Sequence, residues 1–298
     1  MDNIKEAVLR AEKRGISKAL SAVENRASGY LELLDELYIQ GKPSKVIGIT
    51  GAPGVGKSSL INLYAEELLR RNKKVAVIAV DPSSPFTGGA LLGDRIRMNS
   101  FSENLFIRSV ATRGALGGIS DAVFNMIVVF RAAGFDYILI ETVGVGQNEI
   151  QVSKLSDIVL LLMCPGSGDD VQMMKAGIME TCDIVIIHKS DLAGADEIDS
   201  YVKDACFSKK ILRTSVVKNT GIKELADEVD GMYINQQDMI EGRAKNILKE
   251  GLKTLLMHEV LRKVEGIVDS ADIKLKEISE ASTSPYKEMK RLMSKGLV

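Results

Sequence analysis

The sequence is poor in the residues that build transition-metal sites and disulfide frameworks. Its 298 residues include two histidines, His188 and His258, and three cysteines with no Cys-x-x-Cys pair. A zinc or nickel site made of histidine and cysteine would have few ligands to draw on. The cysteines are typical of small buried side chains in a reducing compartment, not of a disulfide framework.

The sequence also lacks an excess of charge of either sign and lacks long apolar runs. The formal net charge is −1, which gives no support for nucleic acid as the main ligand. No apolar run is long enough to cross a bilayer. The mixed-charge N-terminus MDNIKEAVLRAEKRG lacks the basic start and longer apolar core of a signal peptide. We therefore expect a cytoplasmic protein without nucleic-acid or membrane partners. The apolar fraction of 45% and the six prolines predict a globular, core-forming chain.

What the sequence does contain is a series of short apolar runs that alternate with longer helical stretches. The runs are VIGIT (46–50), VAVIAV (75–80), LFIRSV (105–110), YILIET (137–142), IVLLLM (158–163), DIVIIHK (183–189) and KILRTS (210–215). Runs that are apolar at nearly every position predict strands buried on both faces of a parallel sheet covered by helices. The expected fold class is therefore α/β, with a doubly wound, mainly parallel sheet.

Helical extensions are predicted at both ends of the α/β region. Apolar residues at helical spacing between residues 4 and 39 predict a small helical arm with breaks at Gly15 and Gly29. After Gly231 the apolar spacing predicts one long amphipathic helix and a shorter one after Pro285. The expected domains are an N-terminal helical arm (1–42), an α/β domain (43–231) and a C-terminal helical extension (232–298). This extension either packs on its own domain or holds a partner or a second copy of the chain.

The segment GAPGVGKS at residues 51–58 fits the P-loop pattern GxxxxGK[ST] in full, with a predicted strand before it and a predicted helix (57–71) after it. Its glycines let successive backbone N–H groups turn toward a phosphate chain, and the helix N-terminus adds partial positive charge. Lys57 is expected to reach the β- and γ-phosphates, and the Ser58 hydroxyl to bind Mg²⁺. The predicted phosphate-binding residues are Gly51, Ala52, Pro53, Gly54, Val55, Gly56, Lys57, Ser58 and Ser59.

The sequence HKSD at 188–191 follows a predicted buried strand and resembles the NKxD guanine box of GTPases. Asp191 would accept hydrogen bonds from the N1–H and exocyclic amine of guanine, a donor pair that adenine does not present. The stem of Lys189 would lie along the base. His188 stands where the box has asparagine, a departure that bears on base selectivity. The sequence TSV at 214–216, with Ser215 and Val216 as the expected base contacts, ends the next predicted strand and occupies the place of a second guanine-contacting loop.

Acidic residues at strand ends are candidate magnesium ligands, because Mg²⁺ prefers oxygen and keeps several waters. Glu141 ends a predicted strand where a Walker B acid belongs, and Asp94 follows the second strand. The expected metal site consists of Ser58, Asp94 and Glu141, with Asp81 as a further candidate.

Residues just after Glu141 are candidates for sensing and hydrolysing the γ-phosphate. Gly144 is placed to give it a backbone N–H, and Gln147 to orient the attacking water. The predicted catalytic residues are Lys57, Asp94, Glu141 and Gln147. Because no certain arginine finger is evident in cis, we expect slow hydrolysis that rises when a partner orders the switch segments.

Longer motifs resemble one family over roughly residues 1–265: VDPSSPFTGGALLGDRIRM, TRGALGG, ETVGVGQNE and PGSGDDVQMMKAGIME. These motifs identify the chain as similar to the MeaB/ArgK/MMAA family of SIMIBI-class P-loop GTPases. The resemblance implies a homodimer that binds GTP, GDP and Mg²⁺. It also implies that GTP hydrolysis times the loading and protection of an adenosylcobalamin-dependent mutase, typically methylmalonyl-CoA mutase.

The same resemblance implies roles for individual residues. Asp94 and Glu141 match the family's magnesium-site acids, and Asp81 matches its acidic residue after the second strand. By position, the resemblance places Arg97 and Arg113 in segments near the nucleotide or the dimer partner. It also implies an added switch segment at 165–176, with Asp169 and Lys175 as its polar contacts.

Two other classes of function were weighed against this interpretation. An ATP-dependent small-molecule or protein kinase of the ArgK type would use the same P-loop, with TRGALGG and PGSGDD as lids, but a guanine box argues against ATP. A nickel-delivery GTPase would need the histidine runs or paired cysteines that the chain lacks. The sequence does not name the client mutase, since several acyl-CoA and amino-acid mutases use related cofactor chemistry.

Overall fold

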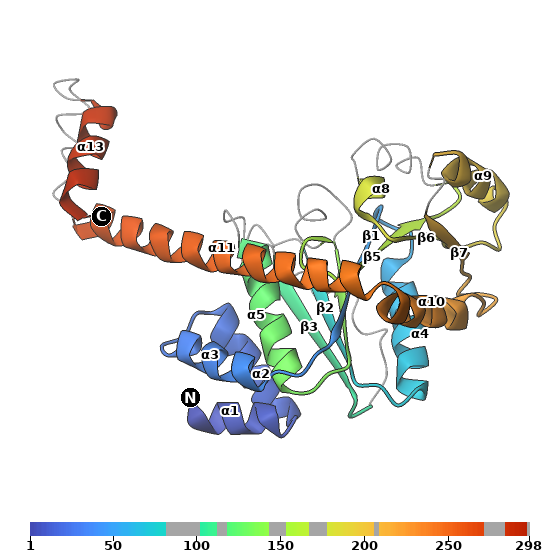
Figure 1. Cartoon of the computed structure of the whole chain (residues 1–298), viewed down its shortest axis with the longest axis horizontal. Helices are drawn as coiled ribbons and strands as arrows, with labels where there is room; N and C mark the ends of the chain where they lie inside the picture. Colours follow the sequence, from blue (N-terminus) through green and yellow to red (C-terminus); the bar gives the residue numbers. More distant parts are fainter. Residues whose placement is uncertain are drawn as a thin grey trace. The chain divides into compact units, whose positions relative to one another are not determined.

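The computed structural model describes residues 1–81, 102–111, 118–142, 153–166, 178–205, 209–270 and 284–296. Within them lies a seven-stranded sheet in the order β3-β2-β4-β1-β5-β6-β7, and every pair of neighbours is parallel (Figure 1). The strands are β1 (Lys45–Gly51), β2 (Val75–Asp81), β3 (Leu105–Ala111), β4 (Tyr137–Glu141), β5 (Ile158–Met163), β6 (Ile184–Ile187) and β7 (Lys210–Arg213). Each predicted apolar run forms one strand, so the α/β fold is confirmed.

Strand β1 occupies the middle of the sheet, between β4 and β5. Ile49 of β1 is in register with Glu141 of β4, and Gly51 is in register with Leu162 of β5. Because all strands run in the same direction, the loops that follow β1, β4 and β6 leave from one edge. Ligands of α/β sheets bind at this carboxyl edge, near the strand where the order reverses.

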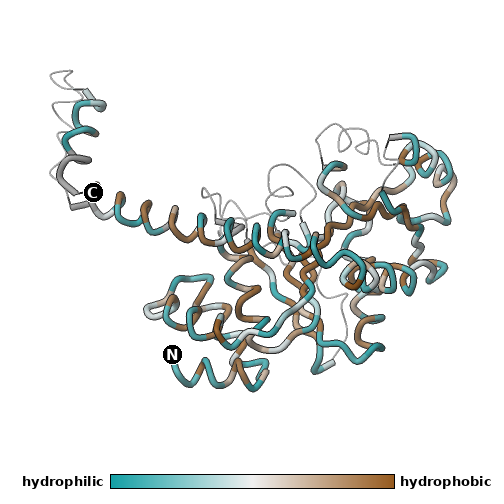
Figure 2. Tube along the Cα trace, in the orientation of Figure 1, coloured by the Kyte–Doolittle hydropathy of each residue, from teal (hydrophilic) through white to brown (hydrophobic). Residues whose placement is uncertain are grey.

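Helices cover both faces of the sheet. On one face α4 (Lys57–Arg70) and α10 (Ile222–Asn235) bury a core that includes Ile47 and Ile49. On the other face α8 (Ile178–Thr181) and α9 (Ala195–Ala205) pack beneath β5 and β6, and α5 (Gly118–Ala132) packs beneath β2 and β3. Figure 2 shows the strands between them as strongly hydrophobic, in line with their continuous burial.

The N-terminal arm forms three helices, α1 (Asp2–Leu9), α2 (Lys13–Glu24) and α3 (Tyr30–Gln40), and α2 and α3 pack against α5. Gly29 precedes α3 with a φ of +79°, as the predicted break requires. The predicted break at Gly15 is wrong, because Gly15 lies inside α2 and the chain turns instead at Ala11, whose φ is +57°. Glycine is needed at position 15 for packing, since a Cβ there would lie 2.4 Å from the Cβ of Ala7.

At the other end, α10 runs through Gly231 to Asn235, so the predicted domain boundary at residue 231 falls within a helix. The predicted long and short helices are present as α11 (Gln237–Ser270) and α13 (Pro285–Gly296). The chain divides into two compact units, Met1–Glu250 and Gly251–Val298. Among the described residues, no helix combines the length and the apolar character needed to cross a bilayer.

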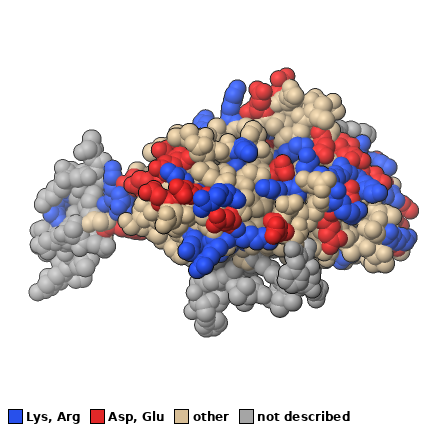
Figure 3. Space-filling model, turned by 90° about the horizontal axis from the view of Figure 1, so that it is seen from below, with Lys and Arg blue, Asp and Glu red and all other residues tan. Residues whose placement is uncertain are grey.

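Ion pairs fix the periphery of the first unit. Arg243, in the first turns of α11, donates to the Asp183 carboxylate over 2.5 and 2.7 Å and to the Asp157 carbonyl over 2.8 Å. At the edge strand β7, Lys210 pairs with Glu228 over 3.0 Å and Arg213 pairs with Asp199. On the face drawn in Figure 3, basic and acidic side chains lie interspersed.

The packing of the arm can be tested by a substitution at Gly15, with a substitution at Gly242 of α11 as its control. We expect Gly15→Ala to lower the free energy of unfolding by about 1–3 kcal/mol, because the new methyl group would also lie 2.9 Å from the backbone carbonyl carbon of Ala7. Gly242→Ala, in α11 with no atom within 4 Å of the new Cβ, should raise it by about 0.5–1 kcal/mol. Urea unfolding of both variants checks this, and equal effects would contradict the proposed close contact.

Candidate nucleotide-binding site

The phosphate-binding loop connects the end of β1 to the start of α4. Gly51 has a φ of +149°, and a Cβ on it would lie 2.5 Å from the carbonyl oxygen of Leu162. Gly56, with a φ of +108°, immediately precedes the first residue of α4. Both positions require glycine, and the resulting loop delivers the N-terminus of a fourteen-residue helix to the carboxyl edge of the sheet. This geometry is suited to binding the phosphate chain of a nucleotide.

Lys57 is buried at the base of this loop. Its ammonium group donates to the carbonyl oxygens of Gly51 over 2.7 Å and of Ala52 over 3.0 Å. The cation is therefore held within the loop, beside the helix N-terminus. Both features attract an anion to the same place.

Two of the predicted magnesium ligands are brought together. The Ser58 hydroxyl donates to the Glu141 carboxylate over 2.5 Å. The pair unites a hydroxyl and a carboxylate, which are oxygen donors of the kind that Mg²⁺ takes in proteins. The backbone of Asp81 ends β2, two residues beyond Ala79, which is in register with Glu141; the side chain of Asp81 lies outside the described atoms.

Several predicted residues lie outside the described part of the chain. They are the magnesium and hydrolysis candidates Asp94, Gly144 and Gln147, and the family-implied Arg97, Arg113, Asp169 and Lys175. Their roles stay predictions. Sequence reasoning also missed a buried pair behind Glu141, in which the hydroxyl of Thr142 lies 3.3 Å from that of Thr50.

The predicted guanine box lies at the same edge, after β6. The Ser215 hydroxyl donates to the Asp191 carboxylate, and this bond is the main reason why the pKa of Asp191 lies below its ordinary value. Ser215 is buried and receives the backbone N–H of Lys218 over 3.1 Å. Ser215 therefore orients the Asp191 carboxylate, and Val216 is exposed. The base contacts expected of these two residues stay predictions.

His188 and Lys189, the first two residues of the guanine box, contact the phosphate loop. Lys189 has a φ of +54°, which ends β6 earlier than predicted, and its ammonium donates to the Gly54 carbonyl over 3.0 Å. The Nδ1 atom of His188 lies 2.9 Å from the hydroxyl oxygen of Thr214, the first residue of the TSV segment predicted as a second guanine-contacting loop. Burial, aided by the charge of Lys189, lowers the pKa of His188 to about 4, so the imidazole is neutral at neutral pH.

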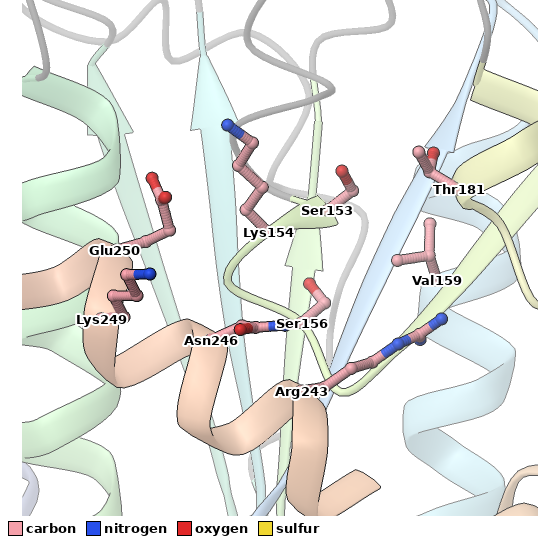
Figure 4. A pocket seen from close by; sticks show the side chains of 9 residues that line it. All are labelled: Ser153, Lys154, Ser156, Val159, Thr181, Arg243, Asn246, Lys249 and Glu250. Carbon is pink, nitrogen blue, oxygen red and sulfur yellow. The ribbon is translucent and has the colours of Figure 1, made fainter. Parts of the chain in front are cut away.

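A pocket of about 410 Å³ lies elsewhere, near the amino-terminal ends of β5 and β6 (Figure 4). Its walls are the chain before and within β5, the end of α8 and the first turns of α11, with the lining residues Ser153, Lys154, Ser156, Val159, Thr181, Arg243, Asn246, Lys249 and Glu250. No predicted site residue lines it. It adjoins the Arg243–Asp183 pair that attaches α11, on the opposite edge of the sheet from the P-loop.

The low pKa of His188 can be measured, because the chain has only two histidines. We expect the imidazole NMR signal that is lost in His188→Asn to stay unprotonated between about pH 5.5 and 8. The folded pKa of about 4 lies below the unfolded value of about 6.5. The unfolded state therefore binds the proton more tightly, and stability from this group is complete above about pH 6.5 and falls as the pH drops toward 4. A signal that titrates near pH 6.5 would contradict the buried, neutral imidazole.

Comparison with known proteins agrees with this geometry. The family model described as "Methylmalonyl Co-A mutase-associated GTPase MeaB" matches residues 16–269. A Pyrococcus abyssi protein whose GTPase name is provisional is 36% identical over 304 residues, covering 96% of this chain and 94% of that protein. The Caenorhabditis elegans protein named methylmalonic aciduria type A homolog, mitochondrial, is 32% identical over 287 residues, covering 86% of this chain and 72% of that one.

Among solved structures, the crystal structure of a LAO/AO transport system kinase shares the fold. It has a TM-score of 0.69 and 24% identity, and the match covers 98% of this chain and 96% of that one. The fold, the P-loop and the extended sequence matches agree, and the chain belongs to the MeaB family of methylmalonyl-CoA mutase-associated GTPases.

Proposed function

We propose that this protein is a GTP-hydrolysing chaperone that gates adenosylcobalamin loading of a cobalamin-dependent acyl-CoA mutase of the methylmalonyl-CoA mutase type, and protects that mutase. The observation that carries the nucleotide part is the placement of the P-loop and the Ser215-oriented Asp191 at one edge of the sheet. The mutase part is supported by the description of the family, which matches residues 16–269.

Hydrolysis in this site would rest on positioning and charge neutralisation. Lys57 would exchange its two carbonyl partners for β- and γ-phosphate oxygens and take up the negative charge that develops there. Ser58 and Glu141, with Asp94 and Asp81 as further candidates, would hold Mg²⁺, which supplies charge neutralisation at the phosphates when bound. Gly144 would donate a backbone N–H to the γ-phosphate, and Gln147 would orient the water.

We further propose that the protein acts as a homodimer with the mutase as its client. Support comes from the second compact unit, where the α11 residues Leu252, Leu256 and Val260 are 59%, 58% and 53% exposed. Large apolar side chains that recur on one helix are costly to leave in water, and a protein partner would cover them. Because a partner would order the switch segments, hydrolysis by the chain alone should be slow.

Base selectivity is the first test. With Mg²⁺ present, calorimetry should show GDP binding at least about tenfold tighter than ADP, a margin of about 1.4 kcal/mol. Asp191→Ala should lose that margin, because the acceptor for the two guanine donors is removed. Asp204→Ala, which removes an exposed aspartate of α9, should keep it. Equal binding of the two nucleotides, unchanged by Asp191→Ala, would overturn the guanine assignment and favour an ATP-dependent kinase.

Turnover is the second test. Phosphate release from GTP should be slow for the purified protein, rise on addition of a client mutase, and disappear in Lys57→Ala. The reason is that Lys57 is the buried cation of the phosphate loop, and that under this proposal the partner controls the switch segments. If the protein alone hydrolysed GTP as fast as metabolic kinases turn over, control of hydrolysis by a partner would be contradicted.

A further inference from the structure

The pocket beside α11 lies within the first compact unit, on the opposite edge of the sheet from the phosphate loop. Figure 4 shows Asn246, Lys249 and Glu250 on α11, and Lys154 and Ser156 on the chain that leads into β5. The end of α8 completes the wall. The volume of about 410 Å³ is in the range of small-molecule sites, so the hollow is large enough to hold a ligand.

Arg243 contributes a fixed guanidinium group to this wall. Its Nη1 donates to the Asp183 carboxylate and to the Asp157 carbonyl, and its Nη2 donates to the other Asp183 oxygen over 2.7 Å. These bonds use three of the five guanidinium N–H groups. Among the described residues, the remaining two N–H groups have no partner. The guanidinium is therefore fixed in direction while two of its donors remain unused.

Three more side chains of the wall carry unused donors. The ammonium groups of Lys154 and Lys249 and the amide of Asn246 have no hydrogen-bond or ion-pair partner within the part of the chain that the structure describes. Several other lysines of the same unit are paired, as Lys210 is with Glu228 over 3.0 Å. The pocket therefore gathers donors that the protein itself leaves unsatisfied.

The lining is positively charged, although the whole chain has a net charge of −1. Even when Arg243 and Asp183 are counted as a neutral pair, two lysines remain against the single carboxylate of Glu250. Most of the other lining side chains are polar, and they include the hydroxyl groups of Ser153, Ser156 and Thr181. Positive charge beside hydroxyl and amide groups suits a ligand that has an oxyanion and a polar body.

We propose that this pocket binds a small polar molecule that carries a phosphate or carboxylate group. Arg243 would bind the oxyanion through its two unused donors, and Lys154 and Lys249 would add positive charge from two sides of the pocket. A hollow of this volume, closed by three segments, favours a small molecule over an extended acidic peptide. The inference does not depend on nucleotide binding at the P-loop.

Calorimetry with ribose 5-phosphate and malate tests the phosphate and the carboxylate forms of this ligand, with ribose as the uncharged control. At least one of the two anions should bind with a Kd below about 10 mM, and ribose should not bind. Lys154→Ala/Lys249→Ala should weaken binding of that anion about tenfold, because two charged contacts are lost. Lys223→Ala/Lys245→Ala removes the same charge from exposed lysines outside the pocket, and the affinity should stay within about twofold of the wild-type value.

A repeat of the titration with saturating GDP and Mg²⁺ separates this pocket from the P-loop. The affinity for the anion should be unchanged, because the two sites lie at opposite edges of the sheet. Thermal unfolding without ligand checks that both double variants fold.

Four results would overturn the inference. They are the absence of binding of both anions, equal weakening in the two double variants, loss of anion binding when GDP is added, and tighter binding of pentaglutamate than of either anion. The last result would indicate that the pocket instead docks an acidic segment of a protein partner.

Discussion

The candidate site depends on the parallel pairing of β1 with β4 on one side and β5 on the other. This register places Glu141 opposite Ile49, so that its carboxylate reaches Ser58 across the start of α4. It also places the Leu162 carbonyl so close to Gly51 that no side chain would fit there. A slip of one residue in β4 would turn Glu141 to the other face of the sheet and separate these groups. The chemistry of the loop therefore follows from the register of three central strands.

The strands beyond β5 add the predicted guanine box to the phosphate loop. The ends of β6 and β7 bring Asp191 beside Ser215, and the hydrogen bond between them lowers the pKa of the carboxylate and fixes its direction. His188 and Lys189 then connect this element to the phosphate loop. The predicted guanine box and the phosphate loop are thus parts of one connected structure, and such connections reduce the ordering that a ligand would have to impose.

Features that depend on neighbouring residues were predictable from the sequence. The seven strands and the P-loop carry local patterns of apolar runs and glycines, and the helices that follow Gly231 and Pro285 carry a helical period. Contacts between distant residues carry no such pattern. The predicted break at Gly15 was wrong because a glycine that serves close packing against Ala7 resembles one that ends a helix. The contact between His188 and Thr214, and the Arg243–Asp183 pair that attaches α11, became visible only when the fold placed these residues together.

The edge strand β7 has a consequence for assembly. An edge strand offers unpaired backbone groups to any strand that approaches, and a sheet can in this way continue from one molecule into the next. In this protein β7 has four residues, and its two terminal cations are engaged with Glu228 and Asp199 of the flanking helices. A short, charge-flanked edge resists such addition. Continuation of the sheet from one copy of the chain into the next is therefore disfavoured at β7.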